Sequence, residues 1–307
     1  MMYKDELKIA YQEDFTTTEI QYRPARPEDV PEMANLFLEA VSDMYARNNM
    51  TAAVPPRPAV LLGYEHVRST GIFHVAEVEG RIAAIAGAIL RDHLWYLSAF
   101  WARPELQRRG IGMPLLRRVW DAGQQAGATI FFTWSSVDSA AMASYMKLGM
   151  VPGYPILLFE GATRKLPSVA SVYQVEALEK SQAMDLDQEI RGTRRPADHE
   201  LWLDRLGFQG RQVLRDGEVV GYYYLGKGAI GPVAWKRPGD GEALLTLACQ
   251  ESIALAPQIR LAVPGVNHSA LRFAFDSGLR LTSFAHFLTT APFGRMEGYL
   301  PWGLGLY

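Results

Sequence analysis

The sequence predicts an α/β protein built from two tandem copies of one fold. Apolar residues alternate between strand spacing and helix spacing along both halves of the 307 residues. Residues 161–170 lose this periodicity and have the composition of a linker. The second half also repeats the spacing of the first. We therefore expect one domain over residues 1–160, closed on itself, and a second over residues 171–307.

Each predicted element follows from periodicity and from turn residues. Strands alternate apolar and polar side chains or form short apolar runs, and helices repeat apolar residues every three to four positions. Glycine and proline mark the breaks, as at residues 53–58. In the first half this predicts strands at 20–25, 71–77, 82–91, 93–102, 129–134 and 150–159, and helices at 30–44, after 58, at 112–127 and at 138–148.

The repeat rests on a constant offset of 129 residues. Two glycine turns and a later helix share this offset, which composition alone does not explain. The matching pairs are Gly110 and Gly239, Gly112 and Gly241, Leu115 and Leu244, Asp138 and Asn267, Ala141 and Ala270, and Gly149 and Gly278.

Composition excludes several classes of function. With a net charge of −2 there is no general basic field, so we expect no nucleic acid and no membrane as partners. The longest aliphatic run, residues 82–90, is much shorter than the roughly 20 residues of a membrane helix. The single cysteine, Cys249, fits a cytoplasmic location. His199 and Glu200 are not followed by a second histidine at Leu203, so we expect no metal.

The turn from Gln107 to Gly112 is the main candidate for chemistry. It lies between a predicted strand and a predicted helix, where free backbone N–H groups and the helix dipole favour an anion. Its two glycines let a phosphate approach the backbone closely. The alternative is an ordinary helix start. No lysine and serine or threonine follow Gly112, so the turn is not a Walker loop.

Two stretches resemble motifs of the GNAT acetyltransferase superfamily. Residues 104–112, PELQRRGIG, resemble its Q/R-x-x-G-x-G/A acyl-CoA motif, and residues 138–150 resemble its second motif, a helix with a tyrosine and a terminal Leu-Gly turn. Asp138 stands where the family usually has asparagine, either as a backbone contact or as a helix cap. The resemblance implies two tandem GNAT-like domains, each with a mixed, mostly antiparallel sheet flanked by helices, and acetyl-CoA as co-substrate.

The resemblance also implies residue roles. Backbone groups of the strand end would hold the pantetheine arm, the turn would hold the diphosphate, and Tyr145 would protonate the leaving thiolate. The implied ligand-binding residues are Phe100, Trp101, Ala102, Gln107, Arg108, Arg109, Gly110, Ile111, Gly112 and Asp138. Arginines that would suit a further phosphate are Arg103, Arg108, Arg109, Arg117 and Arg118.

The sequence leaves several candidates for the general base and for the residues that would bind the acceptor amine. Candidates for the general base are Glu77, Asp92, His93 and Tyr96, and Trp95, Tyr96, Trp101 and Trp134 either form an acceptor pocket or belong to the core. At the 129-residue offset the second copy has Lys236, Pro238 and Ala274 for Gln107, Arg109 and Tyr145, so we expect a degenerate copy. We expect residues 292–307 to pack irregularly, and either the exposed sheet or the tail of the second copy to help shape the acceptor site.

We therefore expect an N-acetyltransferase that acts on a small-molecule or peptide amine, and a homodimer remains open. Two alternatives are a non-enzymatic acyl-CoA sensor and an aminoacyl-tRNA-dependent transferase of related tandem fold. Low basicity and the intact glycine turn count against the tRNA alternative.

Overall fold

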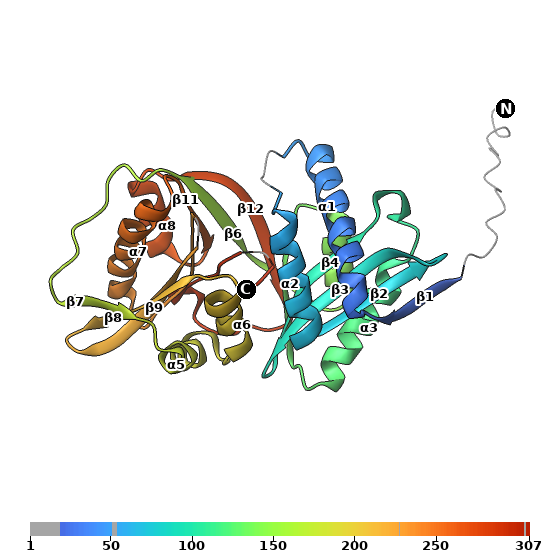
Figure 1. The fold of residues 1–307 in the computed structure, drawn as a ribbon, viewed down its shortest axis with the longest axis horizontal. Coiled ribbons are helices and arrows are strands. Elements are labelled where there is room, and N and C mark those ends of the chain that lie inside the picture. Colours follow the sequence, from blue (N-terminus) through green and yellow to red (C-terminus); the bar gives the residue numbers. More distant parts are fainter. Residues whose placement is uncertain (1–18, 51–53, 227, 304) are drawn as a thin grey trace, which may run out of the picture.

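The computed structural model describes residues 19–50, 54–226, 228–303 and 305–307. The described strands form one 13-stranded sheet in the order β1-β2-β3-β4-β5-β12-β6-β11-β10-β9-β8-β7, with β13 paired to β10. Among the paired strands, β4 with β5 and β10 with β11 are parallel, and the others are antiparallel. Helices flank the sheet (Figure 1). The predicted mixed, mostly antiparallel α/β class is confirmed.

The first half follows the predicted order of elements. Its long helix α1 buries residues spaced by three or four, including Met33, Leu36 and Ala40, which is the pattern that predicted it. The elements are β1 (Ile20–Pro24), α1 (Val30–Arg47), α2 (Arg57–Thr70), β2 (Ile72–Val78), β3 (Arg81–Arg91), β4 (Leu94–Ala102), η2 (Pro104–Leu106), α3 (Gly112–Gln125), β5 (Ile130–Ser135), α4 (Ser139–Lys147) and β6 (Val151–Gly161).

The second half repeats this order with shorter helices before its sheet. Its elements are β7 (Tyr173–Ala177), α5 (Lys180–Arg191), α6 (Pro196–Glu200), η3 (Leu201–Arg205), β8 (Gln209–Arg215), β9 (Glu218–Gly226), β10 (Ala229–Trp235), η4 (Pro238–Asp240), α7 (Gly241–Leu255), β11 (Ile259–Pro264), α8 (His268–Asp276), β12 (Arg280–Thr289), η5 (Met296–Gly298) and β13 (Tyr299–Leu300).

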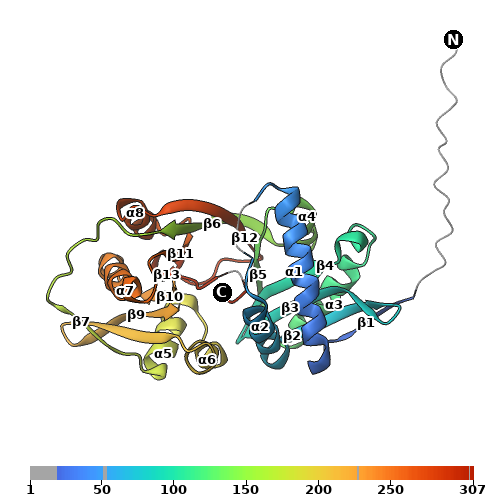
Figure 2. The same cartoon turned by 45° about the horizontal axis from the view of Figure 1, so that its top comes forward.

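The two halves exchange their last long strands. Strand β6 of the first half pairs with β12 and β11, whereas β12 of the second half pairs with β5 of the first. Both strands run between the halves in Figures 1 and 2. The expectation that residues 1–160 close on themselves is therefore wrong, because β5 and β6 of the first half pair with strands of the second half. The proposed domain limits stay a prediction, and residues 1–18 and 51–53 lie outside the described part.

A buried ionic cluster also joins the halves. Asp198 of α6 lies 2.7 Å from Nε2 of His66 in α2 and accepts hydrogen bonds from the guanidinium of Arg91 at the end of β3. Burial opposes ionisation, but His66 and Arg91 hold the pKa of Asp198 well below its usual range. The ion pairs therefore fix α6 against the first half.

The side chains of the first half pack on both faces of the sheet. On one face, which we call the α1 face, Tyr96 and Ala99 of β4 pack in one core with Met33 of α1. On the other, the α3 face, Leu115 of α3 and Tyr145 of α4 form a second core. No helix within the described ranges is long and apolar enough to cross a membrane.

Candidate active site

Strand β4 forks away from β5 at its carboxyl end. The parallel pairing of the two strands ends at Leu97 and Thr133, and the register of β4 against β3 skips Ser98, which marks a β-bulge. Beyond it, the Arg103 amide donates to the Ala83 carbonyl in β3 (3.0 Å). Since main-chain groups alternate along a strand, those of Phe100 and Ala102 face the opposite edge, toward the fork. Among the described residues, the main-chain groups of Phe100 and the amide of Ala102 have no main-chain partner on this side of β4.

The glycine turn continues from this fork. Gln107 holds the turn in place, because its Nε2 donates to the Ala102 carbonyl (3.1 Å) and its Oε1 accepts from Arg47 of α1 (3.1 Å). Arg108 and Gly110 have φ values of 62° and 82°, so the chain turns through the left-handed region at both. Ala102 therefore offers its amide to the fork, and its carbonyl is already taken.

The amides at the start of α3 remain available for an anion. The first N–H groups of a helix have no acceptor within the helix. In the described part of the chain, no hydrogen bond uses the amide of Gly110, Ile111 or Gly112. A Cβ on Gly112 would come within 3.0 Å of the Phe100 ring, so a larger residue would push this ring into the fork. The positive φ of Gly110 favours glycine at that position, and the close approach of the Phe100 ring favours a small residue at Gly112.

Tyr145 of α4 lies beside the fork on the α3 face. Its ring centroid is 5.9 Å from that of Phe100, and its side chain is 6% exposed. Asp138 caps α4, accepting hydrogen bonds from the amides of Ala140 (2.9 Å) and Ala141 (3.0 Å). Burial, and then the negative charge of Asp138, raise the pKa of Tyr145 above its usual value. The phenol is therefore protonated at neutral pH, as a proton donor must be.

Two arginines expected at the turn have other partners. The guanidinium of Arg103 is buried and pairs with Glu32 (3.0 Å) and Glu39 (2.8 Å) of α1, so it is not available to a phosphate. Arg118 lies over the ring of Tyr22, 4.2 Å from its centroid. Arg108, Arg109, Arg117 and Arg118 are exposed.

None of the four expected bases is placed at the fork as a free base. Asp92 and His93 precede β4, about 20 Å from Ala99 at the usual strand rise. Glu77 pairs with Arg23 (2.8 Å). Burial raises the pKa of Tyr96, which keeps its phenol protonated.

The four aromatic residues proposed as a pocket lie on both faces of the sheet. Trp95 packs on the α3 face against Trp120, so its role in an acceptor pocket is excluded. Tyr96, Trp101 and Trp134 lie on the α1 face, where Trp101 is half-buried beside Phe37.

The second half closes the equivalent fork with its own chain. Strand β13 pairs with Val233 and Ala234 of β10, where β4 has a free edge. Helix α7 follows η4 directly, whereas five residues separate η2 from α3, so the second copy has no glycine turn. The offset of 129 residues holds for α3 and α4 but fails before them. The sequence did not reveal that the turn is missing, because Gly239 and Gly241 have the same spacing as Gly110 and Gly112.

The start of α7 also carries its own negative charge. Asp240 is buried there and accepts hydrogen bonds from Tyr173 (3.0 Å) and Arg215 (2.5 Å). A buried carboxylate at a helix start repels a phosphate. Ala274, in the position of Tyr145, is buried and has no proton to donate. The second half lacks the features that make the first a candidate site.

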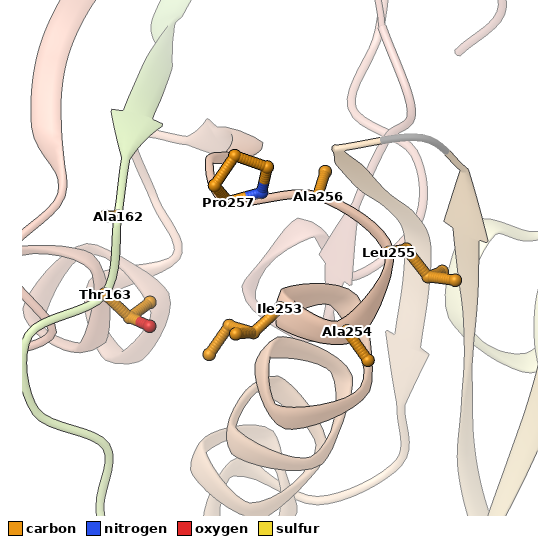
Figure 3. A pocket seen from close by; sticks show the side chains of 7 residues that line it. All are labelled: Ala162, Thr163, Ile253, Ala254, Leu255, Ala256 and Pro257. Atoms are coloured by element: carbon orange, nitrogen blue, oxygen red, sulfur yellow. The ribbon is translucent and has the colours of Figure 1, made fainter.

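A hollow of about 430 Å³ lies elsewhere in the second half, where α7 ends (Figure 3). Ile253 extends from α7 toward Thr163 across it, and Thr163 is its one polar side chain. Its lining has no titratable side chain to activate the Thr163 hydroxyl, so it does not explain a reaction. Within the described residues no group of three or more His, Cys, Asp or Glu side chains is placed to hold a metal ion.

Comparison with known proteins agrees with this geometry. Residues 37–150, which include the carboxyl-terminal part of α1, the fork, the glycine turn and Tyr145, match the family model of the acetyltransferase (GNAT) family. This segment is similar to a GNAT domain. The match and the fold support acyl transfer as the class of reaction. The search of curated proteins gave no match.

Solved structures of acetyltransferases and of a tandem GNAT protein share the fold over most of the chain. A candidate acetyltransferase from Pyrococcus horikoshii has a TM-score of 0.77 at 18% identity, and the match covers 98% of this chain and 100% of that chain. A GCN5-related N-acetyltransferase from Sphaerobacter thermophilus gives 0.63 at 15% identity over 91% and 98%. A tandem GNAT protein from the clavulanic acid biosynthesis pathway gives 0.61 at 14% identity over 89% and 99%. At these identities the likeness concerns the fold, and it supports the tandem architecture.

Proposed function

We propose that the protein is an N-acetyltransferase that transfers an acetyl group from acetyl-CoA to a primary amine. One observation carries the proposal: the free edge of β4 leads directly to the unpaired amides at the start of α3, with Tyr145 beside the fork. An extended pantetheine arm can bond to such an edge as a strand would. The diphosphate would then lie on the amides of Gly110, Ile111 and Gly112.

The residues of the fork suit direct attack by the amine in a ternary complex. The new C–N bond forms as the C–S bond breaks, and Tyr145, which is protonated and packs beside Phe100, would give its proton to the departing sulfur. The proton lost by the amine passes to solvent, because no expected base lies at the fork. An acyl-cysteine route is disfavoured, because Cys249 is buried in the second half and burial raises its pKa to about 12.

Partners and location follow from composition. We propose a small-molecule or peptide amine as acceptor and a cytoplasmic location, without nucleic acid or membrane as partners, because the chain is slightly acidic and has one buried cysteine. A homodimer is compatible with this proposal.

The test combines titration calorimetry with CoA and a thiol-release assay with acetyl-CoA. The assay uses a panel of free amino acids, short peptides, spermidine and kanamycin. The proposal expects CoA binding and amine-dependent thiol release. CoA binding without release for any amine would indicate a sensor instead, and binding of aminoacyl-tRNA without CoA binding would contradict the proposal.

A further inference from the structure

Residues 305–307 of the second half lie against the fork of the first half. The hydroxyl of Ser98, the bulge residue of β4, donates to the Gly305 carbonyl (2.6 Å). The Tyr307 ring packs beside Tyr96 and Trp134, with centroid distances of 5.8 and 5.1 Å. Figures 1 and 2 both show this end of the chain between the two halves. The residues that lie next to the fork beside Ser98 therefore come from the second half of the chain.

Several contacts from the second half fix this segment. The main-chain oxygen of Tyr307 accepts hydrogen bonds from Arg195 (2.7 Å) and Arg191 (3.2 Å), both buried. The Tyr307 hydroxyl donates to the sulfur of Met296 (2.7 Å). Preceding it, β13 is paired to β10. These contacts with buried residues of the second half hold the segment in place, so it presents a defined surface to the fork.

Residues 305–307 lie on the face of the sheet from which an amine would attack the acyl group. Phe100 and Tyr145 occupy the α3 face of the fork, which is also the face of the glycine turn and of α3. Tyr96, Ala99, Trp101 and Tyr307 all belong to the core of the α1 face. Ser98 and Trp101 are partly exposed there. An amine that attacks an acyl group held in the fork would approach from the α1 face, past the partly exposed Ser98.

We propose that residues 305–307 form one wall of the acceptor site, and that Ser98 is a positioning residue that fixes this wall to β4. This inference rests on the proposed function. The second half then has a role in the reaction although its own fork is closed, because it supplies the surface that faces the incoming amine. The wall also limits the access of water to the acyl group, since a closed site excludes solvent.

The test uses water as the acceptor, because it needs no knowledge of the natural amine. Hydrolysis of acetyl-CoA by the full chain is followed by thiol release without amine, and CoA binding is measured by calorimetry. Ser98→Ala removes the hydrogen bond and Tyr307→Ala removes the ring. Ser98→Thr keeps a hydroxyl. Ser277→Ala is the matched control, since Ser277 is a buried serine of the second half whose hydroxyl has no partner among the described residues.

We expect the rate of hydrolysis to rise about three- to tenfold in Ser98→Ala. Loss of one hydrogen bond increases by this factor the fraction of molecules in which residues 305–307 are displaced from β4. Ser98→Thr should restore the low rate, Tyr307→Ala should raise it at least as much, and Ser277→Ala should not change it, with CoA affinity within twofold throughout. Unchanged hydrolysis in folded Ser98→Ala, with normal CoA binding, would overturn the wall alone. Failure of the wild-type chain to bind CoA would overturn the proposed function as well.

Discussion

Replacement of Gly110 by valine tests the anion cradle directly. The φ of Gly110 is 82°, which a β-branched residue does not adopt without strain, although no atom lies within 4 Å of the new Cβ. The turn must therefore rearrange, and the amides of Gly110 and Ile111 lose their common direction. Hydrogen bonds to a charged group contribute about 1.5–3 kcal/mol each, so loss of both costs about 3–6 kcal/mol. We expect CoA to bind Gly110→Val about 100-fold to 10,000-fold more weakly.

Gly127→Val provides the control for this experiment. Gly127 follows the other end of α3, has a φ of 94°, and also has open space around its Cβ. Both variants should lose stability through backbone strain, measured by urea unfolding, but only Gly110→Val should lose affinity in calorimetry with CoA. Affinity within threefold of wild type for Gly110→Val, or equal losses in both variants, would refute the cradle.

Further predictions concern the proton donor, the joint between the halves and the second copy. Tyr145→Phe should lower the rate of thiol release about 10²- to 10⁴-fold with CoA affinity retained, and an unchanged rate would remove Tyr145 from the mechanism. Because its pKa is raised, Tyr145 should cause no loss of rate up to pH 10, and a decline near pH 9 that Tyr145→Phe abolishes would contradict this. Asp198→Asn should lower the free energy of unfolding by about 3–5 kcal/mol in urea, since Arg91 would lose its buried partner. The folded pKa of Asp198 is lowered well below its unfolded value, so its contribution should be complete above about pH 5 and decline progressively below about pH 4. A stability difference between wild type and Asp198→Asn that stays constant from about pH 5 to about pH 2 would refute it. Calorimetry should give one CoA per chain, and two would contradict the closure of the second fork.

Local patterns predicted most of the first half. The apolar spacing of residues 30–44 predicted α1, and Asp138 lies where a helix cap is expected and caps α4. Glycine spacing placed the turn before α3. Tyr145 lies beside the fork, and its role as proton donor stays a prediction. These features depend on residues close together in the sequence, where spacing is informative.

The missed features depend on contacts between distant residues. The exchange of β6 and β12 leaves each strand locally unchanged, and only its neighbours differ. The pairing of Arg103 with two glutamates of α1 removed it from the phosphate site, and no local signal revealed this. Strand β13 spans only two residues and forms where β10 offers a free edge. Such pairings are set by tertiary packing.

A crystal structure of the protein with bound CoA is the most direct test of the central claim. The account predicts density for the diphosphate on the amides of residues 110–112, with the pantetheine arm along Phe100 and Ala102 of β4. Density for the carrier at α7, or a fork that stays empty at saturating CoA, would contradict it.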